Sequence, residues 1–571
     1  MLTQKSPSNP DISLIHQPKR PKRAKRPKRH MMGRFVVRAA LCAFALVLLL
    51  PILAVIASVL QWNRESAHIL QEMSQTVLPD YAITSLMLCI LVAIGVAVVG
   101  MATAIAVTLF EFVGRQTFEW ALLLPIAMPA YVVAYAYTDF LQFSGPAQGW
   151  IRGAFGLQGR VLPEIRSVWG AAWVFTFCLY PYVYLLARTA LAERATHLMD
   201  AARLLGAPLR RRIKEIALPL ARPAVAAGIA LALMETLADF GVSSYFGIQT
   251  FTAGIYKAWL VLDSRIAAAQ LATLLLITVV LLLKIERKAQ KKMRFSAAKG
   301  ANQSHKSQTT EKLQGKQLAV AWLVCITPIL MGFVLPLLFI LRPFLAALRS
   351  DDAVMPWAQF GQWAANSLFL GVVSAVLAVA FALAIAFAMR TRPDRLTHFV
   401  GNLAGLGYAI PGAVIVVGLL IPVGWIQSKW PEASVGYWVT ATVLGVIWAY
   451  VVRFSGVALQ SVQSGYAKIP TSFDDSARML GTNGLNLLRR VHVPLLKRST
   501  AAAALLVFVD VMKELPATLV LRPFNTDTLA VVAYQLARDE RLGEAALPAL
   551  ALVLVGLLPV MLLSRTLRSA K

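Results

Sequence analysis

Long apolar runs alternate with short polar segments along nearly the whole chain. Each run spans about 20 residues or more, the length that an α-helix needs to cross the hydrocarbon core of a bilayer. Only helices and closed barrels satisfy the backbone in lipid, and no run shows the alternation of a barrel strand, so we predict transmembrane helices. The predicted spans, six in each half of the chain, are 36–60, 82–109, 118–141, 168–188, 223–245, 264–284, 317–342, 364–389, 398–424, 436–456, 499–520 and 545–564.

The composition agrees with this pattern. Of the 571 residues, 58% are hydrophobic and only 15% are charged, and the mean hydropathy is +0.64. No soluble domain of this size has such a composition, so the sequence predicts an all-α polytopic membrane protein with about twelve transmembrane helices. The cysteines all lie in apolar runs, without the spacing of metal ligands or of a disulfide framework, and are expected to be buried. They are Cys42, Cys89, Cys178 and Cys325.

The net charge of +28 is concentrated between the apolar runs. A basic chain can indicate nucleic-acid binding, but this distribution is typical of the positive-inside rule, so no nucleic-acid partner is expected. The segments assigned to the cytoplasm are the N-terminal tail, Glu111–Arg115, Arg188–Arg222, Lys284–Lys316, Arg390–Arg395, Arg453–Arg498 and Arg565–Lys571. The segments assigned to the outside are those near 61–80, 143–167, 246–263, 343–363, 425–435 and 521–544. Both termini are therefore predicted to be cytoplasmic.

Two polar segments are predicted to lack a fixed fold. Residues 1–35 contain the basic run PKRPKRAKRPKRH, whose prolines and like charges disfavour a helix. This tail could be a nucleic-acid arm, but its direct entry into an apolar run favours an anchor on acidic lipid. That run is too long for a cleaved signal peptide, so we predict an uncleaved span. Residues 285–316 are predicted to be a cytoplasmic linker between a first half at 36–284 and a second half at 317–565.

One stretch of the sequence occurs twice. DAARLLGAPLRRRIKEIALP begins at Asp200, and DSARMLGTNGLNLLRRVHVP begins 275 positions later at Asp475. Both copies are basic and lie between apolar runs, and a repeat of this length indicates a duplicated module. The matched positions are Asp200, Ala201, Ala202, Gly206 and Pro219 in the first copy and Asp475, Ser476, Ala477, Gly481 and Pro494 in the second.

Each copy is predicted to form two short helices joined at the glycine. The acidic residue suits the positive end of a helix dipole, and the glycine permits a turn that a side chain would obstruct. The proline is expected to end the second helix before the next span. Leu204 and Leu205 give the first helix an apolar face. A basic amphipathic helix could instead lie on anionic lipid, but two copies in register favour docking on a protein partner.

The residue pattern of both copies resembles the cytoplasmic EAA coupling loop of ABC importer permeases, although both copies carry Asp where that family commonly has Glu. The resemblance implies that residues 200–223 and 475–498 dock on a separate ATPase dimer. The chain has no GxxxxGK[ST] phosphate loop, so ATP is expected to be used by that partner. HExxH, GxSxG and CxxC motifs are also absent from the sequence. We predict a transport subunit rather than an enzyme, with no bound cofactor and no stable metal site.

The duplication extends into the predicted spans. Pro129 in IAMPAYVVA matches Pro411 in YAIPGAVIVV. A proline inside a span kinks the helix and frees a backbone carbonyl, which could shape a translocation path. A packing kink without function is an equally good interpretation.

Four acidic residues lie in apolar runs directly after the two loops. They are spaced i, i+4 in each half, so each pair shares one helix face. Charges at membrane depth usually face a cavity or a partner, and four carboxylates along one path would suit a hard, highly charged cation. The acids could instead cap or hold helices, and Lys513 could neutralise one of them. They are Glu235 and Asp239 in the first half and the equivalent Asp510 and Glu514 in the second.

The segments around these acids extend the resemblance. Leu237–Trp259 and Met512–Leu542 are similar to the fused, two-half permeases of ferric-iron ABC importers, and the similarity runs from about residue 35 to the end. It implies two tandem six-helix type I ABC importer permease repeats in the bacterial inner membrane. It also implies a periplasmic iron-binding protein that delivers Fe(III). A permease of this class for polyamine, thiamine or phosphonate is an alternative, and the repeated loop disfavours a secondary transporter.

Overall fold

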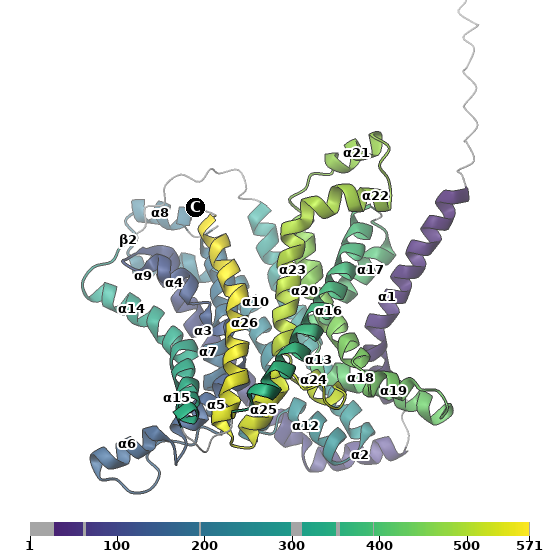
Figure 1. Ribbon diagram of the computed structural model, residues 1–571. Helices are drawn as coiled ribbons and strands as arrows, with labels where there is room; N and C mark the ends of the chain where they lie inside the picture. The colour runs from purple at the N-terminus through teal and green to yellow at the C-terminus, as the bar shows by residue number, and fades with distance from the viewer. Residues whose placement is uncertain are drawn as a thin grey trace, which may run out of the picture.

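The protein is almost entirely α-helical, as the hydropathy pattern predicts (Figure 1). In the computed structural model, the described residues are 28–60, 64–192, 196–298, 311–349, 355–391 and 393–569. Within them the strands are β1 (Phe110–Glu111) and β2 (Glu311–Lys312), which form one short parallel pair. The prediction of an all-α polytopic membrane protein is confirmed.

The helices fall into two successive sets that follow the two halves of the sequence. Those of the first half are α1 (Lys28–Leu60), α2 (Arg64–Gln75), α3 (Leu78–Leu109), α4 (Arg115–Ala121), η1 (Leu124–Ala127), α5 (Ala130–Leu141), α6 (Pro146–Phe155), α7 (Val168–Ala190), α8 (Thr196–Leu204), α9 (Leu209–Arg212), η3 (Ile213–Ala217), α10 (Leu218–Ala238), α11 (Gly241–Phe246), α12 (Phe251–Tyr256), η4 (Lys257–Val261) and α13 (Arg265–Ala298). Those of the second half are α14 (Lys316–Ile329), η5 (Leu330–Val334), α15 (Leu335–Arg349), α16 (Trp357–Thr391), α17 (Arg395–Ala404), η6 (Gly407–Ala409), α18 (Gly412–Lys429), α19 (Val435–Thr440), α20 (Leu444–Tyr466), α21 (Ser472–Met479), α22 (Leu485–Leu487), η7 (Leu488–His492), α23 (Val493–Lys513), α24 (Pro516–Leu521), α25 (Leu529–Arg538) and α26 (Leu542–Ser569).

Nine helices among the described residues are long and apolar enough to cross a membrane, and a bent pair gives a tenth. The predicted first span retains a shorter apolar helix, Cys42–Ser58. The predicted span 499–520 corresponds to α23, which carries Lys497, Arg498, Asp510 and Lys513 and is not among the nine. Every predicted span therefore contains helix, but three of the twelve have no counterpart among these nine helices.

Prolines break two spans that the hydropathy pattern predicts to be continuous. The span predicted at 118–141 is interrupted before Pro129, and its two parts are bent by 88°. The span predicted at 398–424 is interrupted before Pro411, where α18 begins. Both prolines have an extended backbone at the N-cap of the following helix, because a proline cannot donate an N–H to a preceding turn. At these positions the helix is interrupted, rather than kinked as we predicted.

Several predicted boundaries also shift. The spans 223–245 and 499–520 end early, at Ala238 and Lys513, because the acidic residue that follows each one has an extended backbone. The span predicted at 436–456 is replaced by α19 and the later helix α20. Helix α13 continues to Ala298, into the predicted linker, and α1 begins at Lys28, within the predicted unstructured tail. The remainder of that tail and residues 299–310 lie outside the described residues.

The first helix of each half packs against the other half. Helix α1 contacts α17 and α18, while α14 contacts α3 and α15 contacts α5. The backbones approach closely at Gly418 of α18, where any Cβ would clash with the carbonyl of Pro51. Glycine therefore permits this contact between backbones, as is common for helices packed in membranes.

Equivalent hydrogen bonds hold the segment after the fifth helix of each half. Thr250 and Thr528, 278 positions apart, accept from Ala253 N and Val531 N and so start α12 and α25. The equivalent Tyr256 and Tyr534 then cross to the opposite half: Tyr256 donates to Pro516 O at 2.5 Å, and the Tyr534 and Ser244 hydroxyls lie 2.7 Å apart. The two halves are thus joined reciprocally, beyond the continuity of the chain.

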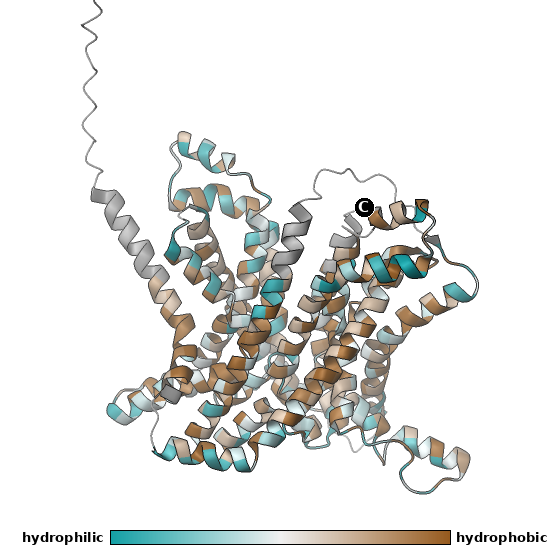
Figure 2. Cartoon of the chain, turned by 180° about the vertical axis from the view of Figure 1, so that it is seen from behind, coloured by the Kyte–Doolittle hydropathy of each residue, from teal (hydrophilic) through white to brown (hydrophobic). Residues whose placement is uncertain are grey.

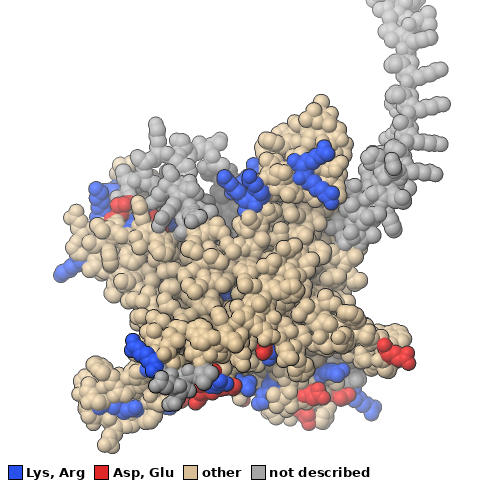
Figure 3. All heavy atoms as spheres, viewed as in Figure 1, with Lys and Arg blue, Asp and Glu red and all other residues tan. Residues whose placement is uncertain are grey.

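Hydrophobic residues are concentrated in the middle of the helical bundle, and hydrophilic residues are concentrated towards its two ends (Figure 2). The repeated segments α8–α9 and α21–α22, which we predict to be coupling segments, lie at the same end (Figure 1). On the face shown in Figure 3, Lys and Arg lie at both ends, but most of the visible acidic residues lie at the end away from these segments, so the end with the segments has the larger excess of basic over acidic residues. This distribution agrees with the positive-inside rule if the coupling segments are cytoplasmic.

The sidedness gives a first testable prediction. A reporter fused after Lys299 should read cytoplasmic, and one fused after Asp352 should read external, because Lys and Arg are concentrated before the first site. Both fusion points lie outside the described residues. Alkaline phosphatase and green fluorescent protein fusions report the two compartments with opposite signals, and an external signal at Lys299 would contradict the arrangement.

Candidate functional site

The two sequence repeats form the same turn. Gly206 and Gly481 follow α8 and α21 with φ angles of +78° and +80°, which other residues adopt only with strain. Ala207 N donates to Ala202 O and Thr482 N donates to Ala477 O, at 3.0 and 2.9 Å. This is the Schellman arrangement that ends a helix at a glycine. The predicted turn at each glycine is confirmed.

Each turn has a pair of exposed apolar side chains beside it. Leu204 and Leu205 are 89% and 87% exposed, and the equivalent Met479 and Leu480 are 90% and 86% exposed. Isolated exposed apolar residues are common, but two equivalent, nearly fully exposed pairs at one end of the molecule favour contact with a partner. The side chain of Asp200 lies outside the described residues, while Asp475 forms an exposed ion pair with Arg478.

Pro219 and Pro494 do not end a helix, contrary to our prediction. Each lies in the first turn of a long helix, α10 or α23, directly after a single π-helical turn. The wider π turn accommodates a proline that cannot donate to the preceding turn. The coupling segment therefore continues into the membrane helix without an interruption.

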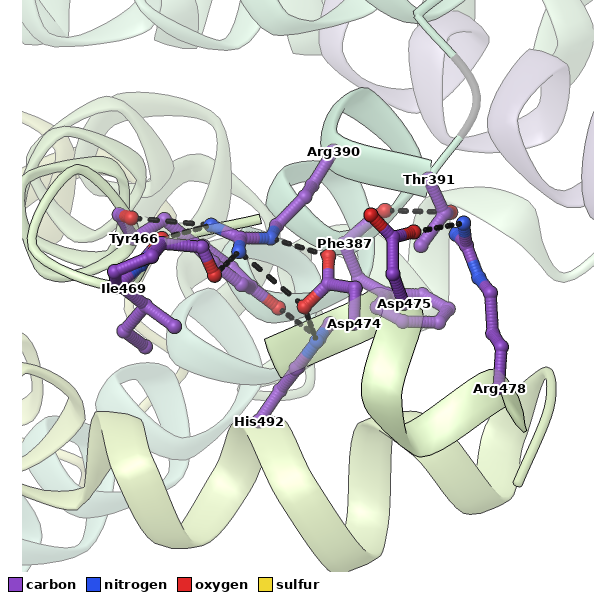
Figure 4. Close-up of polar contacts among 10 residues, drawn as sticks. Phe387, Arg390, Thr391, Tyr466, Ile469, Asp474, Asp475, Arg478 and His492 are labelled. Atoms are coloured by element: carbon purple, nitrogen blue, oxygen red, sulfur yellow. Dashed lines mark hydrogen bonds and ion pairs between the residues drawn. The ribbon is translucent and has the colours of Figure 1, made fainter. Parts of the chain in front are cut away.

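The second loop carries a buried polar cluster (Figure 4). Arg390, in the last turn of α16, donates to both carboxylate oxygens of Asp474 at 2.7 and 3.2 Å. His492 Nε2 lies 2.9 Å from Asp474 Oδ1, and its Nδ1 lies 3.0 Å from the Tyr466 hydroxyl. Burial raises the pKa of Asp474, but the hydrogen bonds from Arg390 and His492 outweigh it and hold that pKa below its usual value. Sequence reasoning missed this cluster, because its members are far apart in the chain.

A polar cavity of about 180 Å³ lies between the two halves. It is lined by the breaks before α5 and α18 and by α7, α10, α20 and α23. Five of the six residues that we predicted for a path line it, and Pro411 does not. The five are Pro129, Glu235, Asp239, Asp510 and Glu514.

Two of the four acids also cap the short helices that follow them. Asp239 Oδ1 accepts from Val242 N at 2.8 Å, at the start of α11. The carboxylate of Glu514, which is 4% exposed, accepts from Ala517 N and Thr518 N at 3.0 and 3.1 Å, at the start of α24. These bonds satisfy backbone donors that a broken membrane helix would otherwise leave unpaired.

The cavity also contains two cations that sequence reasoning did not place there. Arg453 of α20 donates to Glu514 at 3.0 Å, so Arg453, rather than Lys513, neutralises this acid. Lys513 instead donates to Ile126 O in the first half, at 2.8 Å. We had assigned Arg453 to a cytoplasmic segment because the predicted span ended close to it. The apolar residues on both sides of Arg453 could have indicated that it lies within a membrane helix.

Together these features define a class of protein. Two tandem helical repeats enclose a charged cavity at membrane depth, and each repeat extends one exposed loop at the same end. This is the organisation of a membrane permease with a duplicated transport unit.

The comparisons place the permease in a family. The chain belongs to the family described as binding-protein-dependent transport system inner membrane component, whose sequence profile matches residues 98–288 and 377–569. It is 24% identical over 484 residues to the Fe(3+)-transport system permease protein FbpB 2 of Haemophilus influenzae, which covers 84% of this chain and 88% of that protein. It is 23% identical over 509 residues to the probable ABC transporter permease protein y4fN of Sinorhizobium fredii, covering 83% and 84%. A putative 2-aminoethylphosphonate transport system permease protein, PhnV of Salmonella typhimurium, is 27% identical over 200 residues, covering 35% of this chain and 72% of that protein. The chain is therefore a multi-pass inner-membrane transport component.

The shared turn yields a second prediction. The double variant Gly206→Val, Gly481→Val should abolish transport and leave the protein inserted in the membrane. A β-branched residue with positive φ is strained by about 1–2 kcal/mol, which would displace the exposed apolar pairs. Gly361→Val is a matched control, because Gly361 lies in a helix with open space at its Cβ position. Normal transport by the double variant would exclude a coupling role for these turns.

Proposed function

We propose that this chain is the permease subunit of an ATP-driven importer that moves ferric iron delivered by a periplasmic binding protein. The observation that carries the proposal is the cavity between the halves, where four repeat-related carboxylates meet at membrane depth. Carboxylate oxygens suit a hard, highly charged cation, and a bare ion of this charge could not cross hydrocarbon. The similarity to a ferric-iron permease over 84% of the chain supports the same cargo.

Coupling to a separate ATPase is supported by the loops. The exposed pairs Leu204–Leu205 and Met479–Leu480 offer each ATPase subunit an equivalent apolar anchor. The continuous helices α9–α10 and α22–α23 would carry a displacement of either loop directly to the acids at the cavity. Both loops, both termini and the ATPase would then lie in the cytoplasm.

The two cations in the cavity favour a second candidate. Arg453 and Lys513 could bind a phosphonate or another oxyanion, and a relative of part of the chain is named as a phosphonate permease. The cavity is lined by four acidic and two basic side chains, and this excess of acids favours a cation over an oxyanion as the cargo.

Uptake measurements distinguish these cargoes. A strain that lacks this chain should lose accumulation of radiolabelled Fe(III), and expression of the chain should restore it. Radiolabelled 2-aminoethylphosphonate serves as the matched alternative cargo. Restoration of phosphonate uptake without restoration of iron uptake would contradict the proposal.

The acids provide a third prediction. Glu235→Gln with Asp510→Asn should lower iron uptake about tenfold, equivalent to about 1.4 kcal/mol in the transport barrier. These side chains line the cavity one helical turn before the capping acids, so their neutralisation should leave the helix breaks intact. Membrane levels measured by immunoblotting should equal those of the wild type.

The capping acids form the matched comparison. Asp239→Asn with Glu514→Gln should reduce the amount of folded protein, because the backbone donors of α11 and α24 and the Arg453 guanidinium lose a charged acceptor. Full iron uptake by a well-expressed Glu235→Gln, Asp510→Asn variant would show that cavity charge does not assist the cargo.

A further inference from the structure

The buried cluster of the second loop connects every element that meets there. The Arg390 guanidinium donates to three backbone oxygens, of Tyr466, Ile469 and Pro470, at 2.9–3.1 Å. These carbonyls belong to the end of α20 and the link to α21, while its carboxylate partner Asp474 lies in the first turn of α21. One side chain of α16 therefore fixes both the end of a membrane helix and the start of the coupling helix.

His492 extends this connection to the next membrane helix. It is the last residue of η7, directly before α23, and its side chain is fully buried. If Nε2 carries the proton, His492 donates to Asp474 and accepts from the Tyr466 hydroxyl, so the neutral ring is satisfied on both sides. The ring also packs edge-on against Phe387 of α16, with centroids 5.4 Å apart.

Burial distinguishes this cluster from an ordinary surface ion pair. The side chains of Arg390 and Asp474 are 11% and 6% exposed. Exposed pairs contribute little to stability, whereas a buried pair with every donor matched fixes one geometry and tolerates few others. The planar fork of Arg390 matches a carboxylate and three carbonyls at once, which a lysine could not do.

The first loop lacks this arrangement at the equivalent positions. Met199 and Ala217, both buried, stand where the second loop has Asp474 and His492. The equivalent arginine, Arg115, is 2.7 Å from Glu111 and 3.4 Å from Glu119. Two of the three equivalent positions in the first half are therefore apolar, and its arginine pairs with carboxylates on β1 and α4 instead of with the loop.

We propose that Arg390, Asp474 and His492 are positioning residues, which lock the second coupling loop to α16, α20 and α23. The inference rests on the proposed function, since it requires that a partner ATPase acts on the loops. The second loop would then transmit a displacement rigidly to these three helices.

The test uses the whole complex, purified with its ATPase subunits and reconstituted with the binding protein. Arg390→Lys keeps the positive charge beside Asp474 but loses the fork. We expect normal membrane levels, continued ATP hydrolysis, and about a tenfold rise in ATP hydrolysed per cargo ion transported, within the range of known coupling energies. Asp474→Asn should raise this ratio in the same direction. Arg160→Lys, in an exposed ion pair with Glu164, is the matched control and should change nothing.

Each outcome decides between positioning and structural roles. An unchanged ratio in Arg390→Lys would overturn the proposal. A proportional loss of protein level, ATP hydrolysis and transport would also overturn it, because that pattern indicates a folding role alone. If the wild-type complex hydrolyses ATP without moving iron, the proposed cargo fails. The hydrolysis of ATP stimulated by the binding protein then tests the lock independently, and an equal stimulation in Arg390→Lys and wild type would overturn it.

Discussion

The structure depends on one constraint: a backbone broken inside a bilayer must find partners for its free N–H and C=O groups. Asp239 and Glu514 meet this need where α10 and α23 end, by accepting from the N–H groups of α11 and α24. Lys513 similarly donates to Ile126 O at the break before Pro129. The groups that satisfy the broken helices also line the cavity, where Glu235 and Asp510 add two further carboxylates one helical turn earlier.

Duplication produced the framework, and divergence made its halves unequal. The turns at Gly206 and Gly481, the Thr caps of α12 and α25 and the crossed tyrosines are equivalent in both halves. The cavity acids are equivalent too, but Arg453 and Lys513 come from the second half alone, where the first half has Cys178 and Ala238. The second loop likewise has Asp474 and His492 where the first has Met199 and Ala217. Because both halves belong to a single chain, each first half is always paired with one second half, and these differences are retained in every molecule.

The features that occur in both halves could be predicted from the sequence, because comparison of the two copies identifies equivalent residues without a structure. The sequence located the glycine turns, the acids that line the cavity and the helical membrane fold. It did not predict that Pro129 and Pro411 break their spans, because hydropathy averages over a break. It assigned Arg453 both to the end of the predicted span 436–456 and to a cytoplasmic segment, and it missed Arg390, Asp474 and His492 as a unit. Those residues are brought together by packing between distant helices, which no local pattern records.

We propose that cargo passes through the cavity between the halves. Cys178 can test this proposal, because this native thiol lines that cavity. With Cys42, Cys89 and Cys325 replaced by Ala, labelling by a membrane-impermeant, charged thiol reagent would be measured from each side of the membrane, with and without trapped ATP. We expect labelling from one side in one nucleotide state, and either protection or labelling from the opposite side in the other. Equal labelling from both sides in every state, or none in any state, would contradict it.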